Sequence, residues 1–207
     1  MPTLLVNGGP VMWLIIIAAG TAAVVFFERA LFCHRSQINS AEFLNGVRTV
    51  IKRGNVVEAI AICDATAGPV ARLVKAAILH REQGRERVRE AVEEAGLTEV
   101  PRLEEKLNLL ATIAQISPLL GLFGTIVGFI QMFMALEKAG LYAHISGGPD
   151  SLATGIWQAL ICAAAGIAVA IPAHAGYNYL VSRVNKIVLD MERAAAEIVN
   201  IVTENGK

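Results

Sequence analysis

Three long stretches of the chain contain no Asp, Glu, Lys or Arg, and this feature constrains the fold more than any other. They cover residues 11–27, 107–136 and 151–182 of a 207-residue sequence. About 20 apolar residues are enough for an α-helix to cross the hydrocarbon core of a bilayer. The first stretch is close to that minimum, and the other two exceed it. The sequence therefore predicts three transmembrane helices.

The composition agrees with a membrane protein. Charged residues make up 17% of the chain, whereas a soluble domain carries about a quarter. The alternative for the first span is a cleaved signal peptide, because small residues lie within 18–23. However, no Lys or Arg precedes this span, and its apolar part is longer than the core of a usual signal peptide. We therefore expect an uncleaved anchor.

The distribution of Lys and Arg predicts the orientation. Residues 28–106 hold 13 of these 18 residues, four follow Ser182, and only Lys138 lies elsewhere. Lys and Arg concentrate in the cytoplasmic loops of membrane proteins. This predicts an outer N-terminus, a cytoplasmic segment between the first two spans, an outer loop before the third span, and a cytoplasmic tail.

The pattern outside the spans is helical. Apolar residues recur at helical spacing in 41–52 and 70–78, with breaks at Gly54 and Gly84. We expect Pro101 to open a helix that continues without a stop into the second span, and the third span to continue into an amphipathic tail. The prediction is an all-α membrane protein whose second and third spans extend into a cytoplasmic helical bundle. Its segments are a periplasmic N-terminus (1–10), a first span (11–27), a cytoplasmic helical domain (28–106), a second span (107–136), a periplasmic loop (137–150), a third span (151–180) and a cytoplasmic C-terminal helix (181–207).

Little in the sequence indicates catalysis. The three cysteines, Cys33, Cys63 and Cys162, show no metal-ligand spacing, and the predicted topology gives them no extracytoplasmic disulfide. The four histidines are too scattered to suggest a metal site. There is no nucleophile–base set, metal cluster or phosphate loop. We therefore expect no enzyme activity, no metal, no cofactor and no nucleic-acid partner.

The second span contains small residues at a spacing of four. Gly124 and Gly128 form one such series, and Ser117, Gly121 and Thr125 form another. Small residues at this spacing let helix backbones approach closely in lipid. The glycines therefore predict helix packing. The hydroxyl of Thr125 either bonds its own backbone or lines a wet path between subunits.

The third span carries a second row of small or polar residues, also in steps of four. An unpaired amide in hydrocarbon costs several kcal/mol, so Gln158 is expected to face protein or water and not lipid. The alternative for Gln158 is a structural function, in which its amide joins two helices by a hydrogen bond. Pro172 is expected to kink the inner end of the span. His174 is expected at the inner interface, either as a buried or snorkelling side chain or as a proton relay. The row consists of Thr154, Gln158, Cys162, Gly166 and Ala170.

None of the three spans contains an acid or a strong base. A protein that moves protons through a membrane usually needs an ionisable group inside it. If protons move through this protein, the carrier must therefore come from another chain.

The two longer spans resemble those of the MotA/TolQ/ExbB proton-channel family. The resemblance is carried by PRLEEKLNLLATIAQISPLLGLFGTIVGFIQMF at 101–133 and by GIWQALICAAAGIAVAIPAHAGYNYLVSR at 155–183. GPVARLVKAAI at 68–78 and EEAGLTEVPRLEE at 93–105 are similar to the cytoplasmic part of ExbB-type members. Three predicted spans favour the ExbB/TolQ branch over the flagellar MotA branch.

The resemblance implies a ring of subunits in the bacterial inner membrane, commonly a homopentamer. This ring would surround a single-span partner of the ExbD/TolR type, whose membrane Asp carries the proton. The complex would convert proton motive force into work on a periplasmic or outer-membrane process, such as transport with a TonB-like protein. Thr125 matches the family's second-span threonine and becomes the expected contact of the partner's Asp.

Two positions depart from the family pattern. The ExbB and TolQ proteins usually have Glu where this chain has Gln158, and Thr where it has Ala163. Because an amide does not titrate, no proton-shuttling function carries over to Gln158. We expect Thr125, Gln158, Thr154, Cys162 and Ala163 to line the proton path or contact the partner. The alternative is a non-conducting structural ring that anchors a membrane partner.

Overall fold

A computed structural model of the chain describes residues 9–36, 39–139 and 150–204. Within these ranges, the side chains of residues 9, 135, 136, 138, 139, 150–154 and 204 are not described. The N-terminal segment predicted at 1–10 and the loop predicted at 137–150 therefore lie almost wholly outside the described residues.

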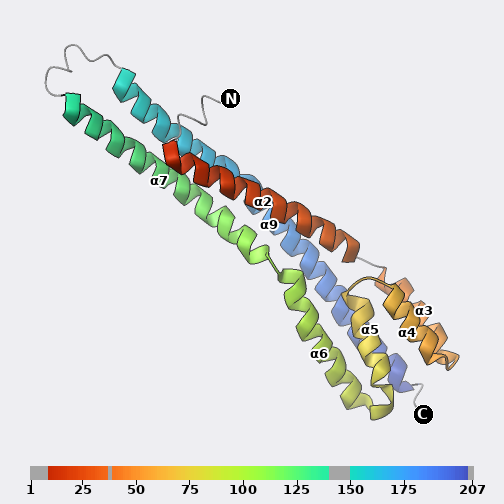
Figure 1. The fold of residues 1–207 in the computed structure, drawn as a ribbon. Coiled ribbons are helices and arrows are strands. Elements are labelled where there is room, and N and C mark those ends of the chain that lie inside the picture. Colours follow the sequence, from red (N-terminus) through yellow and green to blue (C-terminus); the bar gives the residue numbers. More distant parts are fainter. Residues whose placement is uncertain (1–8, 37–38, 140–149, 205–207) are drawn as a thin grey trace. The chain divides into compact units, whose positions relative to one another are not determined.

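All regular structure in the described ranges is helical (Figure 1). Three helices are long and apolar enough to cross a membrane. The charge-free stretches lie within α2, α7 and α9, as the sequence predicts. The elements are α2 (Gly9–Ser36), α3 (Ser40–Lys52), α4 (Val56–Ala65), α5 (Pro69–Leu79), the 3-10 helix η1 (Arg81–Gln83), α6 (Arg85–Glu104), α7 (Leu107–Ala139) and α9 (Asp150–Glu204).

The described residues form two compact units. Unit 1 contains residues 9–27, 106–139 and 150–178, and unit 2 contains the described residues of 28–105 and 179–204. Unit 1 therefore holds the apolar spans, and unit 2 holds α3 to α6 together with the second part of α9.

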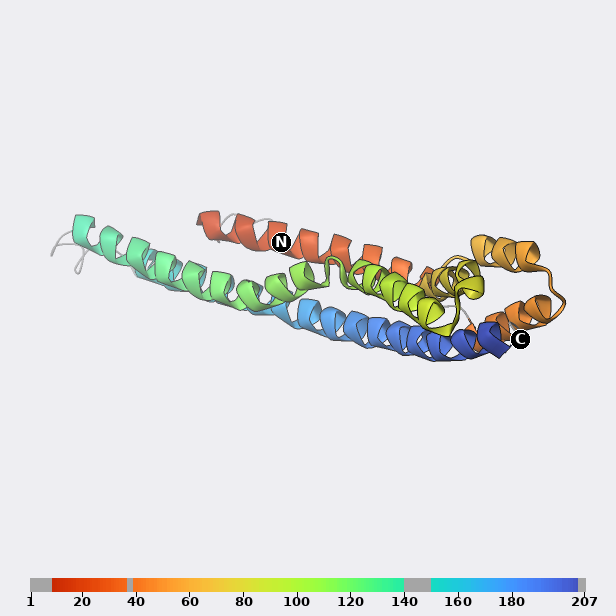
Figure 2. The ribbon, with the colours of Figure 1, turned by 90° about the horizontal axis from the view of Figure 1, so that it is seen from below.

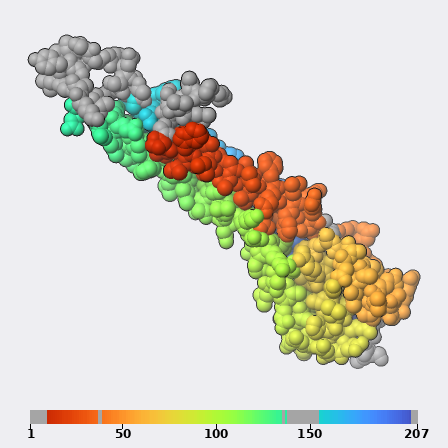
Figure 3. Space-filling view, in the orientation of Figure 1, coloured from red at the N-terminus to blue at the C-terminus, as the bar shows by residue number. Residues whose placement is uncertain are grey.

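Unit 1 is a bundle of three helices. The first part of α9 lies beside α7, and the first part of α2 lies along one face of that pair (Figures 1 and 2). Figure 3 shows α2 over part of α7, and a Cβ atom added to Gly124 of α7 would lie 3.3 Å from the Cγ1 of Val11 of α2. The buried positions of α7 alternate steps of three and four, which places them on one side of a helix. They are Leu107, Leu110, Ala114, Ser117, Gly121, Gly124 and Gly128.

Unit 2 has an apolar core built from amphipathic helices. The face predicted for α5 is buried as expected, from Val70 to Ile78. The second part of α9 buries residues in alternating steps of four and three, which is the spacing of a coiled-coil seam. These residues are Leu180, Val184, Ile187, Met191, Ala194 and Ile198.

The helix predicted to run from Pro101 into the second span is wrong. Pro101 lies inside α6, which begins at Arg85 and ends at Glu104, and α7 begins only at Leu107. Lys106, between the two helices, has φ 63°. This left-handed conformation cannot continue a right-handed helix. The third span does continue as predicted, because α9 is helical from Asp150 to Glu204.

Candidate functional site

Main-chain atoms of α7 and α9 approach one another closely in unit 1. A Cβ atom added to Gly121 would lie 3.0 Å from the carbonyl oxygen of Cys162 and 3.2 Å from the Cα of Gly166. Gly128 packs in the same way on Ala159, with 3.2 Å between the added Cβ and the alanine Cβ. In lipid, helices associate through such close packing. The packing predicted for these glycines therefore occurs within one chain.

Cys162 takes part in this contact. Its side chain is buried, and its Cβ would lie 2.6 Å from a Cβ added to Gly124. Gly166 and Ala170 are also buried. Three members of the small row on α9 thus pack inside the chain, which supports a packing function for Cys162. Its contact with a partner chain stays a prediction.

Thr125 lies at the edge of the α7–α9 contact. It is half-buried and follows Gly121 by four residues, which is about one helical turn. Its Oγ1 donates a hydrogen bond to the carbonyl oxygen of Leu122 at 2.6 Å. The self-bonded alternative for Thr125 is therefore present in the single chain, and the oxygen can still accept a further hydrogen bond.

Ala163 marks the same edge of the contact as Thr125. A Cβ added to Gly121 would lie 3.3 Å from the Cα of Ala163, and Thr125 is about one turn further along α7. Both side chains are half-buried in the chain. This edge therefore carries both Thr125 and Ala163.

Helix α2 covers the opposite edge of the pair. A Cβ added to Gly176 would lie 2.8 Å from the Cδ2 of Phe26, and one added to Gly124 would lie 3.3 Å from the Cγ1 of Val11. Gln158 precedes Gly176 by 18 residues, which is five turns of an α-helix at 3.6 residues per turn. Gln158 therefore lies on the α2 side, about 140° around α9 from Ala163 at about 100° per residue.

Gln158 is half-buried, and its side chain makes no hydrogen bond to another described residue. Thr154, which precedes it by one turn, is helical, but its side chain lies outside the described part of the chain. The structure thus separates Gln158 from Thr125 and Ala163, which the sequence had grouped with it.

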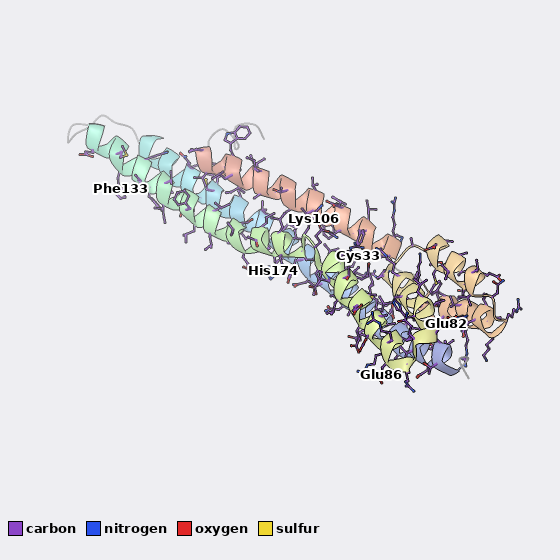
Figure 4. The ribbon with its side chains drawn as sticks, turned by 60° about the horizontal axis from the view of Figure 1, so that its bottom comes forward. Cys33, Glu82, Glu86, Lys106, Phe133 and His174 are labelled. Carbon is purple, nitrogen blue, oxygen red and sulfur yellow. The ribbon has the colours of Figure 1, made fainter. Side chains whose placement is uncertain are left out.

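Two further predicted residues lie near the inner end of unit 1. Pro172 is exposed, so it takes no part in the α7–α9 contact of the single chain. His174 is also exposed, and its ring centroid lies 6.4 Å from that of Tyr177. The location of His174 at the inner membrane interface stays a prediction. Figure 4 labels His174 toward the end of unit 1 where Lys106 lies, and Phe133 toward the other end.

The sequence reasoning missed a buried arginine at the start of unit 2. The Arg29 side chain is 5% exposed, and its Nη2 lies 3.0 Å from Oε2 of Glu105. Its Nη1 donates to the carbonyl oxygen of Arg102 at 3.2 Å, which satisfies an acceptor near the end of α6. The only sequence signal was its position as the first basic residue after an apolar span.

No group of three or more potential metal ligands occurs among the described residues. In the part of the chain that the structure describes, the cysteines are buried and form no disulfide. The described site is a helix contact with polar residues at its edges.

The sequence of this chain matches a known family of membrane channels. Residues 65–193 match the MotA/TolQ/ExbB proton channel family. A biopolymer transport protein ExbB homolog of Methanothermobacter thermautotrophicus is 26% identical over 180 residues, which cover 86% of this chain and 62% of that protein. The Tol-Pal system protein TolQ of Haemophilus influenzae is 40% identical over 104 residues, which cover 50% of this chain and 43% of TolQ. The chain thus spans less than two thirds of the length of these two relatives.

A third relative matches over a larger share of its length. The biopolymer transport protein ExbB-like 1 of Synechocystis sp. is 33% identical over 177 residues, which cover 85% of this chain and 68% of that protein. The family match includes the described contact of α7 with α9. The chain belongs to the MotA/TolQ/ExbB proton channel family.

Proposed function

We propose that this chain is the ring subunit of a proton-driven motor in the bacterial inner membrane. In the proposed complex, several copies, five in the leading version, surround a single-span partner of the ExbD/TolR type. The N-terminus lies in the periplasm and the C-terminus in the cytoplasm. The complex uses proton motive force for work on a periplasmic or outer-membrane process, such as transport with a TonB-like protein.

One observation carries the proposal. Within residues 107–136 and 151–182 there is no carboxylate, so a carboxylate that carries protons in these spans has to come from another chain. Thr125 offers a half-buried hydroxyl at the edge of the α7–α9 contact, where such a partner's Asp could accept or donate a hydrogen bond. Protons are favoured over sodium because the spans lack carboxylate oxygens, which are ligands for hard cations.

The second candidate is a non-conducting ring that only anchors a membrane partner. The specific observation in its favour is that Gln158 and Ala163 stand where ExbB and TolQ proteins usually have Glu and Thr. The two candidates differ in whether a proton flux accompanies the assembly.

A comparison of two threonine variants separates the candidates. The complex is isolated mildly from its own membrane, weighed by native mass spectrometry, and reconstituted in vesicles that report proton flux. We expect a ring with a smaller number of single-span chains, and a Thr125→Ala variant that keeps this assembly but loses most of the flux.

Thr112→Ala is the matched control. The Thr112 hydroxyl also bonds its own helix, to the carbonyl oxygen of Asn108 at 2.7 Å, but its side chain is exposed away from the α9 contact. It should keep both assembly and flux. A ring without any flux in the unmodified protein would favour the structural alternative.

A further inference from the structure

His174 lies on the same side of α9 as Ala163. The two residues are 11 positions apart, which is about three turns, so their directions differ by only about 20°. Gln158 lies about 160° around the helix from His174 by the same geometry. The edge that α2 leaves uncovered thus holds Thr125, Ala163 and His174.

His174 lies closer to the inner end of the span than Ala163 does. His174 is about 16 Å from Ala163 along the helix axis at 1.5 Å per residue. The first charged residue of α9 after it is Arg183, about 13 Å further on. His174 is the only histidine in the three charge-free stretches, and its side chain is exposed in the single chain.

We propose that the α2-free edge of the α7–α9 pair is the proton path, and that His174 is the relay through which protons leave it toward the cytoplasm. Gln158 lies on the α2 side and takes no part in this transfer. This inference rests on the proposed motor function and adds the exit step to it.

The chemistry of the relay balances without another cofactor. Water that has taken a proton from the partner's carboxylic acid gives that proton to the imidazole nitrogen that carries no hydrogen. The imidazolium then releases the proton of its other nitrogen to water on the cytoplasmic side. One proton enters and one leaves, and the ring ends neutral in its other tautomer. Exchange of the two tautomers through water resets the relay.

The test uses the whole complex as it is isolated from its own membrane, with any single-span chain that accompanies it. The complex is reconstituted in vesicles that contain a pH-sensitive dye, and a potassium gradient with valinomycin sets the membrane potential. We expect His174→Gln to lower the proton flux at least tenfold with an unchanged native mass. The control His34→Gln removes an exposed histidine of α2 and should leave the flux unchanged.

Two further variants distinguish a relay from a structural function. Added imidazole should restore flux to His174→Gly, because free imidazole can occupy the space and transfer the proton. Loss of flux in His174→Gln without rescue of His174→Gly would overturn the relay.

The Gln158→Ala variant tests the position of the path. It should conduct like the unmodified complex, and a tenfold loss of flux in that variant would overturn the assignment of the path to the α2-free edge.

The result for the unmodified complex separates this inference from the proposed function. If the unmodified complex conducts and His174→Gln conducts equally, the relay is wrong while the motor function stands. If the unmodified complex conducts no protons, both are wrong.

Discussion

A Cβ atom on Gly166 would lie 2.6 Å from the carbonyl oxygen of Ser117. This separation is shorter than any ordinary contact, and the opposing atom belongs to the main chain. No change of rotamer can therefore relieve it. Helices in lipid gain little from the hydrophobic effect when they associate, so close packing of this kind supplies much of their attraction.

Gly166→Ala should destabilise unit 1. The added methyl group forces α7 and α9 apart, and overpacking of this kind costs about 1–3 kcal/mol. Thermal unfolding of the detergent-solubilised protein measures the effect. Gly20→Ala is the matched control, because nothing lies within 4 Å of a Cβ at that position of α2. It should be neutral or stabilising by up to about 1 kcal/mol, and an equal loss in both variants would contradict the contact.

Removal of Glu105 should destabilise unit 2 through Arg29. The arginine is buried, so Glu105→Ala leaves its charge without its carboxylate partner. Breaking a fully buried pair costs about 3–5 kcal/mol, and because Glu105 is 63% exposed we expect about 1–3 kcal/mol. Denaturant titration measures the free energy of unfolding.

Two comparisons test the explanation for Arg29. The double variant Arg29→Met, Glu105→Ala should recover part of the loss, because it removes the buried charge itself. Glu93→Ala breaks the exposed pair of Arg89 with Glu93 and should change the free energy by at most about 0.5 kcal/mol. A double variant less stable than Glu105→Ala alone would show that packing of the Arg29 stem dominates.

Cys63 should resist thiol reagents at neutral pH in the folded protein. Burial, with a smaller contribution from Asp64, raises the pKa of its thiol from 9.0 to about 11. The thiolate is the reactive form. In a variant that retains only this cysteine, with Cys33→Ala and Cys162→Ala, alkylation at pH 8 should therefore wait for unfolding. Fast alkylation under native conditions would contradict the burial.

The same raised pKa gives a pH dependence of stability. The folded state favours the neutral thiol, so its contribution is fully present below pH 9 and is lost as the pH rises toward 11. Cys63→Ala lacks this component. The difference in free energy of unfolding between the unmodified protein and Cys63→Ala should therefore shrink between pH 9 and 11, and a difference that grows with pH would reverse the sign.

Substitutions at Lys106 should depend on their tolerance of positive φ. This residue has φ 63° between α6 and α7, a conformation that Asn and Gly adopt readily and β-branched residues avoid. Lys106→Asn should keep the stability of the protein, and Lys106→Val should lose about 1–2 kcal/mol. Circular dichroism during thermal unfolding measures both variants. Equal stability of the two would indicate that the break between the helices moves elsewhere.

The spans and the glycine packing could be predicted from the sequence because they depend on simple patterns. Long stretches without charge favour insertion into a bilayer. Small residues in steps of four favour the close approach of two helix backbones. Gly121, Gly124 and Gly128 therefore pack as predicted. The break at residues 105–106 could not be predicted, because its sequence, Glu-Lys, contains none of the residues that usually end a helix.

The sequence also could not predict which side of α9 is covered by α2. Gln158 and Cys162 are one turn apart, so spacing alone places them in one row. Only the position of α2, fixed by the contact of Phe26 with Gly176, shows which edge is covered. Arg29 was missed for a similar reason, since its partner Glu105 is 76 positions away in the sequence.

The main-chain contact between α7 and α9 restricts how the protein can move. Side-chain atoms can shift by changing rotamers, whereas the carbonyl oxygens of Ser117 and Cys162 and the Cα atoms of Gly121 and Gly166 have no such freedom. The two helices should therefore move as a single rigid strut. Any movement that accompanies the proposed motor function would then have to take place outside this contact.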